Sequence, residues 1–212
     1  LAMLCGAFVL PRVWHEISSA GWWAIGLLLS AGWSNLGYVL AVLHGEVMRV
    51  VLLFYLAPLW TVLFSYWLLD ERLNRYGFFI VFLSFGGAVV MLWKPQLGLP
   101  LPGNFAEWTG LSAGMAFALS NVVSRRASHL SVVSKSYSVL LGTALLTVPL
   151  MWWQGGVQSQ LVAIDVQTWL VLGLLGIVLC ATSFTVQYAL VFLPANRAII
   201  LFLFELVVAA TS

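Results

Sequence analysis

The chain has 212 residues, of which 62% are hydrophobic and 8% are charged, with a formal net charge of +2. Soluble domains carry about 25% charged residues, so this composition excludes a water-soluble domain. The mean hydropathy of +1.03 indicates a membrane protein. The sequence has no basic patch of the kind that binds nucleic acid, so no nucleic-acid partner is expected.

Eight apolar segments follow one another and predict an all-α polytopic membrane protein. A helix needs about 20 apolar residues to cross a bilayer. Helices are expected because backbone groups exposed to lipid must be bonded within their own segment. Tryptophans near several segment ends agree with these boundaries, since indoles favour the headgroup interface. The expected spans are residues 1–10 (the end of one helix), 21–43, 50–69, 76–93, 108–124, 136–153, 168–192 and 198–212.

Basic residues alternate between the connections that join these spans. Only Arg49 and Lys94 lie in the second, fourth or sixth connection. Cytoplasmic loops carry the excess of Lys and Arg, so we expect connections 11–20, 70–75, 125–135 and 193–197 to be cytoplasmic. Seven residues carry this bias: Arg12, Arg72, Arg75, Arg125, Arg126, Lys135 and Arg197.

An internal repeat emerges when the chain is shifted by 147 residues, which places Trp22 on Trp169 and Gly26 on Gly173. The matched spans run in opposite directions through the membrane, and inverted repeats are typical of secondary transporters. The offset predicts two five-helix repeats that rock against each other, of which spans two to nine are present. We expect a first repeat at 1–95 without its first helix and an external connection at 96–106. The second repeat is expected at 107–212, without the end of its fourth helix and its fifth.

Several stretches of the chain resemble the EamA domain of the drug/metabolite transporter superfamily. The signature has A-P in the fourth helix, G-E-R/K-L at a tight turn, and a glycine-rich fifth helix. Asp70 stands where that signature has Gly, and Leu206 where Pro often follows Glu. The matching stretches are Ala57–Pro58–Leu59, Asp70–Glu71–Arg72–Leu73 and Gly86–Gly87.

This resemblance implies a secondary transporter in a bacterial cytoplasmic (inner) membrane. It would move a small organic metabolite, amino acid-like or drug-like, by alternating access and more often outward. The alternative is a non-transporting polytopic scaffold or sensor with the same fold. The expected partners are a small-molecule substrate and the lipid bilayer, while a coupling proton and a homodimer are left open.

Six polar residues form the candidate path for substrate or ions. Asn35 and Tyr38 share one helix face, and Ser183 and Gln187 share a stripe in the opposing repeat. Glu205 lies about 16 Å into its span, near the midplane, where acids mark ion or substrate paths. The alternative role is to bond neighbouring helices, with Glu205 as a packing residue. The set is Asn35, Tyr38, Tyr55, Ser183, Gln187 and Glu205.

Further polar and proline residues have two interpretations each. Pro58 lacks a backbone N–H, so we expect a kink that either builds the site or only bends the helix. Glu46 and Arg49, three residues apart, form either an external gate or an ordinary exposed ion pair. Glu71 is expected to pair locally with the arginines that follow it and to cap its turn.

Enzymatic activity is not expected from the sequence. Gly110–Gly114 matches G-x-S-x-G, but a nucleophile elbow requires a strand-to-helix turn, and this stretch lies in a predicted membrane helix. Gly110 and Gly114 instead predict a close-packing G-x-x-x-G face. Cys5 and Cys180 lie in apolar spans and are expected to be buried small hydrophobes, so neither a metal nor a cofactor is implied.

Overall fold

A computed structural model of the chain describes residues 15–19, 21–71, 102–153 and 165–192, with a few residues between 75 and 87. The regular elements in these ranges are all helices, as predicted. Four segments are long and apolar enough to cross a membrane: Trp22–His44, Val47–Leu69, Val132–Trp152 and Val166–Ala189. The chain is therefore an all-α polytopic membrane protein.

The named helices agree with the predicted spans to within a few residues. They are α3 (Trp22–His44), α4 (Val47–Phe54), α5 (Ala57–Leu69), α7 (Phe105–Arg126), α8 (Val132–Trp153) and α10 (Val166–Phe192). The predicted spans 1–10 and 198–212, with Glu205, lie outside the described residues, and 76–93 lies largely outside them. One boundary was wrong: Lys135, predicted in the loop 125–135, is buried in the first turn of α8.

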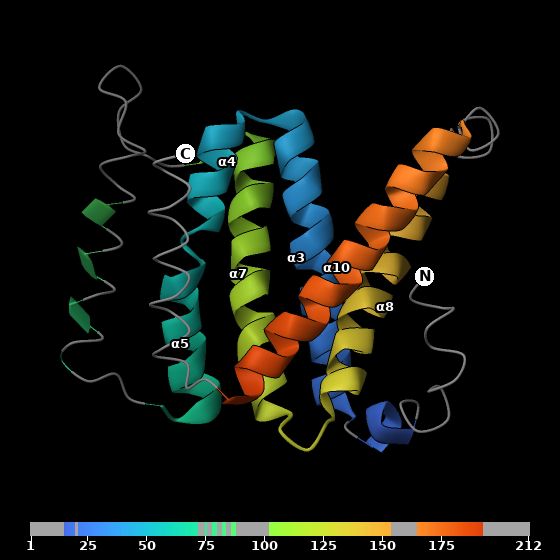
Figure 1. Cartoon of the computed structure of the whole chain (residues 1–212). Coiled ribbons are helices and arrows are strands. Elements are labelled where there is room, and N and C mark those ends of the chain that lie inside the picture. Colours follow the sequence, from blue (N-terminus) through green and yellow to red (C-terminus); the bar gives the residue numbers. More distant parts are fainter. Residues whose placement is uncertain are drawn as a thin grey trace.

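α3 is the central helix of the bundle. In Figure 1, α4 and α5, then α7, α3 and α8 stand side by side in that order, and α3 packs most extensively on α7 and α8. Two glycines allow α3 and α8 to cross at backbone contact. Gly142 lies against the carbonyl group of Leu28, and a Cβ added at Gly32 would lie 2.5 Å from the carbonyl oxygen of Gly142.

The G-x-x-x-G face of α7 packs against α4. A Cβ added at Gly110 would lie 3.1 Å from Val50 Cγ1, and one added at Gly114 would lie 2.5 Å from the carbonyl oxygen of Phe54. The predicted close-packing role of these glycines is confirmed. α7 is not among the four segments apolar enough to span a membrane by composition. Many of its polar residues are buried in the bundle, so lipid does not reach them.

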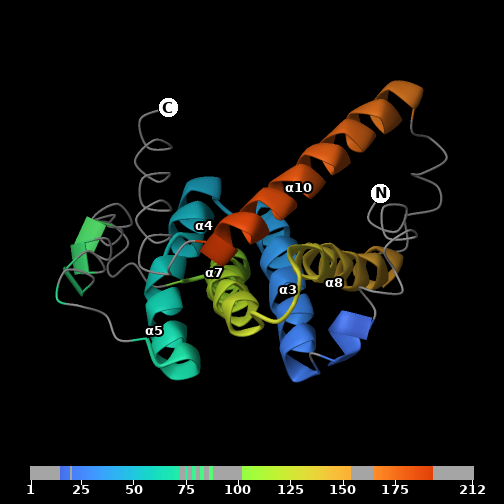
Figure 2. The same cartoon turned by 60° about the horizontal axis from the view of Figure 1, so that its bottom comes forward.

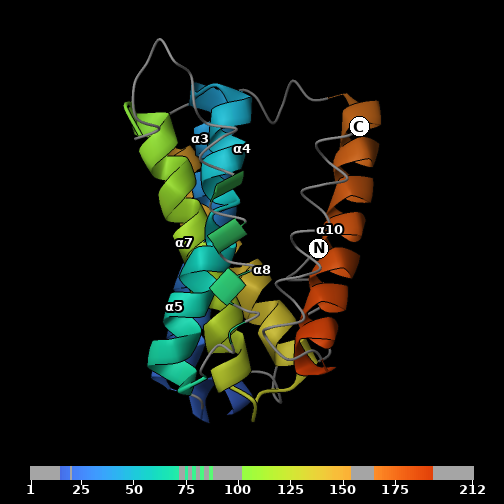
Figure 3. The same ribbon diagram turned by 90° about the vertical axis from the view of Figure 1, so that its left-hand side faces the viewer.

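α10 stands to one side of the other helices. It crosses in front of α8 in Figure 1, and its upper part extends away from the bundle in Figure 2. In the view of Figure 3 it lies apart from α4, α5 and α7. Residues 165–179 are exposed apart from the half-buried Gly173 and Gly176, whereas Gln187 near the other end is buried.

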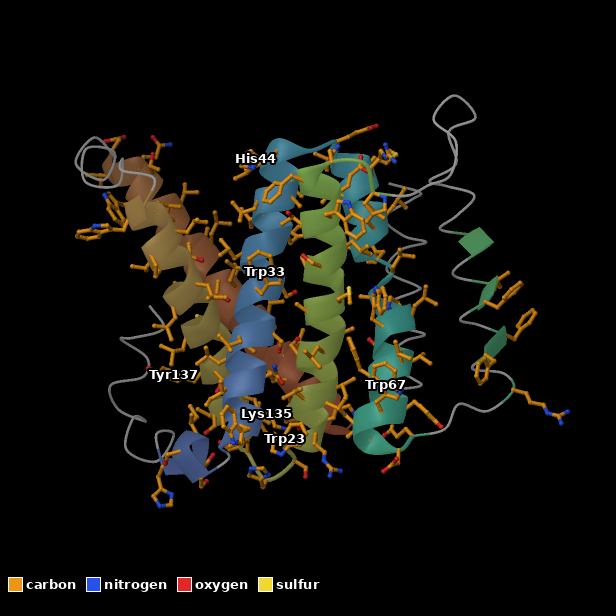
Figure 4. The ribbon with its side chains drawn as sticks, turned by 180° about the vertical axis from the view of Figure 1, so that it is seen from behind. Trp23, Trp33, His44, Trp67, Lys135 and Tyr137 are labelled. Carbon is orange, nitrogen blue, oxygen red and sulfur yellow. The ribbon has the colours of Figure 1, made fainter. Side chains whose placement is uncertain are left out.

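The two ends of the bundle carry different connections. The lower end in Figure 1 holds the turn between α7 and α8, and the upper end holds the turn between α3 and α4. Figure 4 shows Trp23 and Lys135 at the lower end and His44 at the upper end. At the lower end, Glu16 accepts hydrogen bonds from the hydroxyl groups of Ser131 and Ser134, which ties residues 15–19 to the start of α8.

Candidate functional site

The span that contains Pro58 is broken rather than continuous. α4 ends at Phe54 and α5 begins at Ala57, because Pro58 has no N–H to donate to the carbonyl oxygen of Phe54. Between the two helices, the N–H of Leu56 bonds to the carbonyl group of Leu53, three residues back, in the pattern of a 3₁₀ turn. Tyr55, a predicted path residue, lies in this break, and Pro58 is buried just after it.

Aromatic side chains pack around the end of α4. The ring centroids of Tyr38 and Phe54 are 4.8 Å apart, and those of Phe54 and Phe117 are 5.5 Å apart. Tyr38 therefore packs on the broken span, and Phe54 of that span packs in turn on α7. Pairs of this geometry contribute about 0.5–1.5 kcal/mol beyond the burial of their area.

Asn35 lies between α3 and α8. Its side-chain amide donates to Thr143 Oγ1 at 3.0 Å and to the carbonyl group of Ala31, one turn back. Thr143 follows Gly142, so this hydrogen bond lies beside the point where the two helices touch. In the described conformation Asn35 joins two helices, which is the alternative role that its sequence position allowed.

Gln187 and Ser183 lie on the face of α10 that meets the bundle. Ser124 of α7 donates its hydroxyl hydrogen to Gln187 Oε1 at 2.7 Å, and both side chains are buried. One turn earlier on α10, the hydroxyl group of Ser183 is buried without a hydrogen-bond partner in the described residues. An unpaired buried hydroxyl is costly, so Ser183 has an unused capacity to bond a ligand.

Buried polar side chains gather in the lower half of the bundle. Few polar groups are expected inside a membrane protein unless they bond helices or line a path. The hydroxyl group of Ser136 is buried without a partner in the described part of the chain. These residues come from α7 and α8: Ser120, Asn121, Ser124, Ser134, Lys135, Ser136 and Ser138. They were not predicted as a group, although their serine-rich spacing was visible in the sequence.

An ion pair fastens the upper ends of α4 and α7. Arg49 Nη1 lies 3.1 Å from Glu107 Oε1, and Glu107 is only 2% exposed. The same carboxylate accepts from the N–H of Gly103 and from the amide of Asn104, which in turn accepts from the N–H of Glu107. Asn104 and Glu107 form a capping box at the start of α7. The N-x-x-E spacing could have revealed this partner of Arg49.

A second ion pair fastens the lower ends of α5 and α7. Arg125 donates from both terminal nitrogens to the two carboxylate oxygens of Glu71, at 2.7 and 3.0 Å. Glu71 was expected to pair with the arginines next to it in sequence, but in the described residues it reaches Arg125, 54 positions away. The bidentate geometry is the strong form of this interaction.

The chain can now be compared with known proteins. Residues 1–93 match the model of the EamA-like transporter family. Over these residues the chain is similar to the EamA-like transporter family. No curated protein and no solved structure matches the chain. The family match covers α3, the broken span and the turn that carries Glu71.

The conformation of the turn after α5 bears on the position where Asp70 replaces the Gly of the EamA signature. Asp70, where the signature has Gly, adopts φ +54° and ψ +23°, in the left-handed region. Glycine is the usual residue at such a helix end because it has no Cβ, and Asp is among the few others that tolerate it. The N–H of Glu71 bonds back to the carbonyl group of Ser65 and closes the turn.

Of the six predicted path residues, Glu205 lies outside the described residues, and the others contact different helices. Asn35 bonds α8 and Tyr38 packs on α4, whereas Gln187 bonds α7. Tyr55 lies in the helix break. The external gate of Glu46 and Arg49 stays a prediction, in which Arg49 also pairs with Glu107.

Proposed function

We propose that the protein is a secondary transporter, which moves a small organic metabolite across a bacterial cytoplasmic (inner) membrane by alternating access, in the outward direction. The family match of residues 1–93 carries this proposal. The broken span and the buried polar residues support it, because interrupted helices and intramembrane polar groups commonly build transport sites. The proposed substrate is amino acid-like or drug-like, with polar groups that hydrogen-bond.

We place the substrate path along the face of α10 that carries Ser183 and Gln187. The hydroxyl group of Ser183, which has no hydrogen-bond partner among the described residues, supports this placement, since a substrate with polar groups would satisfy it. In this proposal Asn35, Tyr38 and Tyr55 contribute to the path from α3 and from the break between α4 and α5. We further propose that Glu205 carries a coupling proton, because its predicted position is near the membrane midplane.

Transport by the full-length protein in liposomes tests this proposal. Vesicles containing a pH-sensitive dye are exposed to pooled amino acids and metabolites, and both substrate flux and proton movement are followed. We expect Glu205→Gln to abolish proton-coupled flux, because the amide cannot release or accept the proton. Asp165→Asn is the matched control, since Asp165 is an exposed carboxylate at the start of α10.

The outcomes separate the competing functions. Flux without proton movement that persists in Glu205→Gln would remove Glu205 from the coupling step but keep the transporter. Absence of flux for every pool, with a protein that is folded and monodisperse, would favour the non-transporting scaffold or sensor.

A further inference from the structure

The main bundle mixes helices from both predicted repeats. α3 and the α4–α5 span belong to the predicted first repeat, at 1–95, whereas α7 and α8 belong to the second, at 107–212. Yet α3 packs chiefly on α7 and α8, and α4 and α5 both pack on α7 (Figure 1). The most extensive contacts of the described helices therefore cross the boundary between the repeats.

These contacts between repeats are made at backbone distance. α3 meets α8 where Gly32 faces Gly142, and α7 meets α4 where Gly114 faces the carbonyl group of Phe54. A tilt of either helix pair would drive side chains into the opposite backbone, because close-packed interiors repack in discrete steps rather than deform smoothly. The close packing indicates that these four elements keep their relative positions.

Two ion pairs of opposite polarity hold the same interface at its two ends. At the upper end the cation, Arg49, is on the broken span and the anion, Glu107, is on α7. At the lower end the anion, Glu71, follows the broken span and the cation, Arg125, is on α7. A rocking motion between these elements would open one pair at a time. Opening the upper pair would leave Glu107 as a buried, unpaired charge, which is strongly unfavourable.

α10 is attached to this bundle much more weakly. Its contact is with α8 and, less extensively, with α7. A Cβ added at Gly173, in the upper part of α10, would meet no atom of the described residues within 4 Å. The polar bond described between α10 and α7 joins Ser124 to Gln187, next to the unpartnered hydroxyl group of Ser183. Small interfaces of this kind are where relative motion is expected.

We infer that α3, α4–α5, α7 and α8 move as one rigid body that contains parts of both repeats, and that α10 moves against it. The hydrogen bond between Ser124 and Gln187 then breaks and re-forms in each transport cycle. This motion replaces the expected rocking of one repeat against the other. The inference rests on the proposed transport function for its role, although the division into moving parts can be measured separately.

Pairs of introduced cysteines test whether the α4–α7 contact stays fixed while the α7–α10 contact opens. Cys5 and Cys180 are first replaced by Ala. Val50→Cys with Gly110→Cys then crosslinks α4 to α7, since the Gly110 Cβ position lies 3.1 Å from Val50 Cγ1 and a disulfide needs Cβ atoms about 4 Å apart. Ser124→Cys with Gln187→Cys, joined by a short bis-methanethiosulfonate through two disulfide bonds, crosslinks α7 to α10. Compared with the same double variants before crosslinking, we expect the first crosslink to leave flux unchanged and the second to abolish the remaining flux until the link is reduced. If Gln187→Cys itself removes flux, the spin-label distances decide whether α10 moves.

Spin-label distances give a readout that does not need flux. Labels at the exposed residues Met48 and Phe105 report on the α4–α7 boundary, and labels at Phe105 and Leu170 report on the α7–α10 boundary. In lipid bilayers we expect one narrow distance for the first pair and a broad or double distribution for the second. The opposite pattern, or loss of flux on crosslinking Val50 to Gly110, would overturn the inference. The expected distances in a protein without any flux would support the moving parts and reject the transport function.

Discussion

The two ion pairs in the described residues differ in how deeply their charged side chains are buried, and therefore in strength. Glu107 is nearly inaccessible and has three donors around its carboxylate, so its charge is compensated where lipid cannot solvate it. Removing one partner of a buried ion pair costs about 3–5 kcal/mol. The Glu71–Arg125 pair is more exposed, with 36% of the Glu71 side chain accessible, and exposed pairs contribute about 1 kcal/mol or less. The Arg49–Glu107 pair therefore contributes more to the stability of the bundle than the Glu71–Arg125 pair.

Asp70 offers a direct test of a single backbone conformation. Its left-handed φ of +54° strains every residue with a Cβ, and its side chain is exposed. We expect Asp70→Gly to raise the free energy of unfolding by about 0.5–1 kcal/mol and Asp70→Val to lower it by about 1–2 kcal/mol. Thermal unfolding of the purified variants in one detergent measures both changes. Equal midpoints for the Gly and Val variants would show that this turn is relaxed in the membrane protein.

At the scale of helices, periodicity and charge predicted the elements but not their neighbours. The spans were predictable because apolar length and tryptophan position depend on the bilayer, which acts on each helix separately. The break near Pro58 follows from one missing donor, and the close packing at Gly110 and Gly114 from one small-residue spacing. The partners of Glu71 and Arg49 were missed because both pairs join residues more than 50 positions apart.

Paired glycine substitutions test whether close helix packing holds the bundle together. Gly114→Ala places a Cβ 2.5 Å from the carbonyl oxygen of Phe54, whereas Gly173→Ala places one where nothing lies within 4 Å. Overpacking costs about 1–3 kcal/mol, so Gly114→Ala should destabilise the protein. Gly173→Ala should stabilise it by about 0.5–1 kcal/mol, because Ala favours helix. Unfolding midpoints of the two variants measure the contrast, and a stabilised Gly114→Ala would contradict the packing in the structure.

For the molecule as a whole, the ion pairs and the contacts between helices support the inference that the rigid body contains helices from both predicted repeats. In the predicted repeats, the same arrangement of five helices occurs twice, in opposite orientations in the membrane. The described bundle nevertheless joins α3 and α4–α5 to α7 and α8 more closely than α7 and α8 join α10. The proposed transport path lies along the face of α10 where Ser183 has no hydrogen-bond partner among the described residues.

The orientation of this bundle in the membrane follows from its charges. Among the described residues, the lower end carries Arg125 and Arg126 at the end of α7 and Lys135 at the start of α8 (Figure 4), whereas the upper end carries Arg49. The excess of positive charge predicts that the lower end is cytoplasmic. Single cysteines in a variant without Cys5 and Cys180 test this orientation, because a membrane-impermeant maleimide labels only the accessible side.

We expect Gly103→Cys, before α7, to be labelled in intact cells, and Ser128→Cys, after α7, to be labelled only in inverted vesicles. Both positions are exposed, and a Cβ at Gly103 meets no atom within 4 Å, so neither substitution should disturb the fold. The reverse labelling pattern would place Arg125 and Arg126 outside and invert the direction of every span. Labelling of both positions in intact cells would show that α7 does not cross the membrane. The polar composition of α7 would then indicate a helix at the membrane surface.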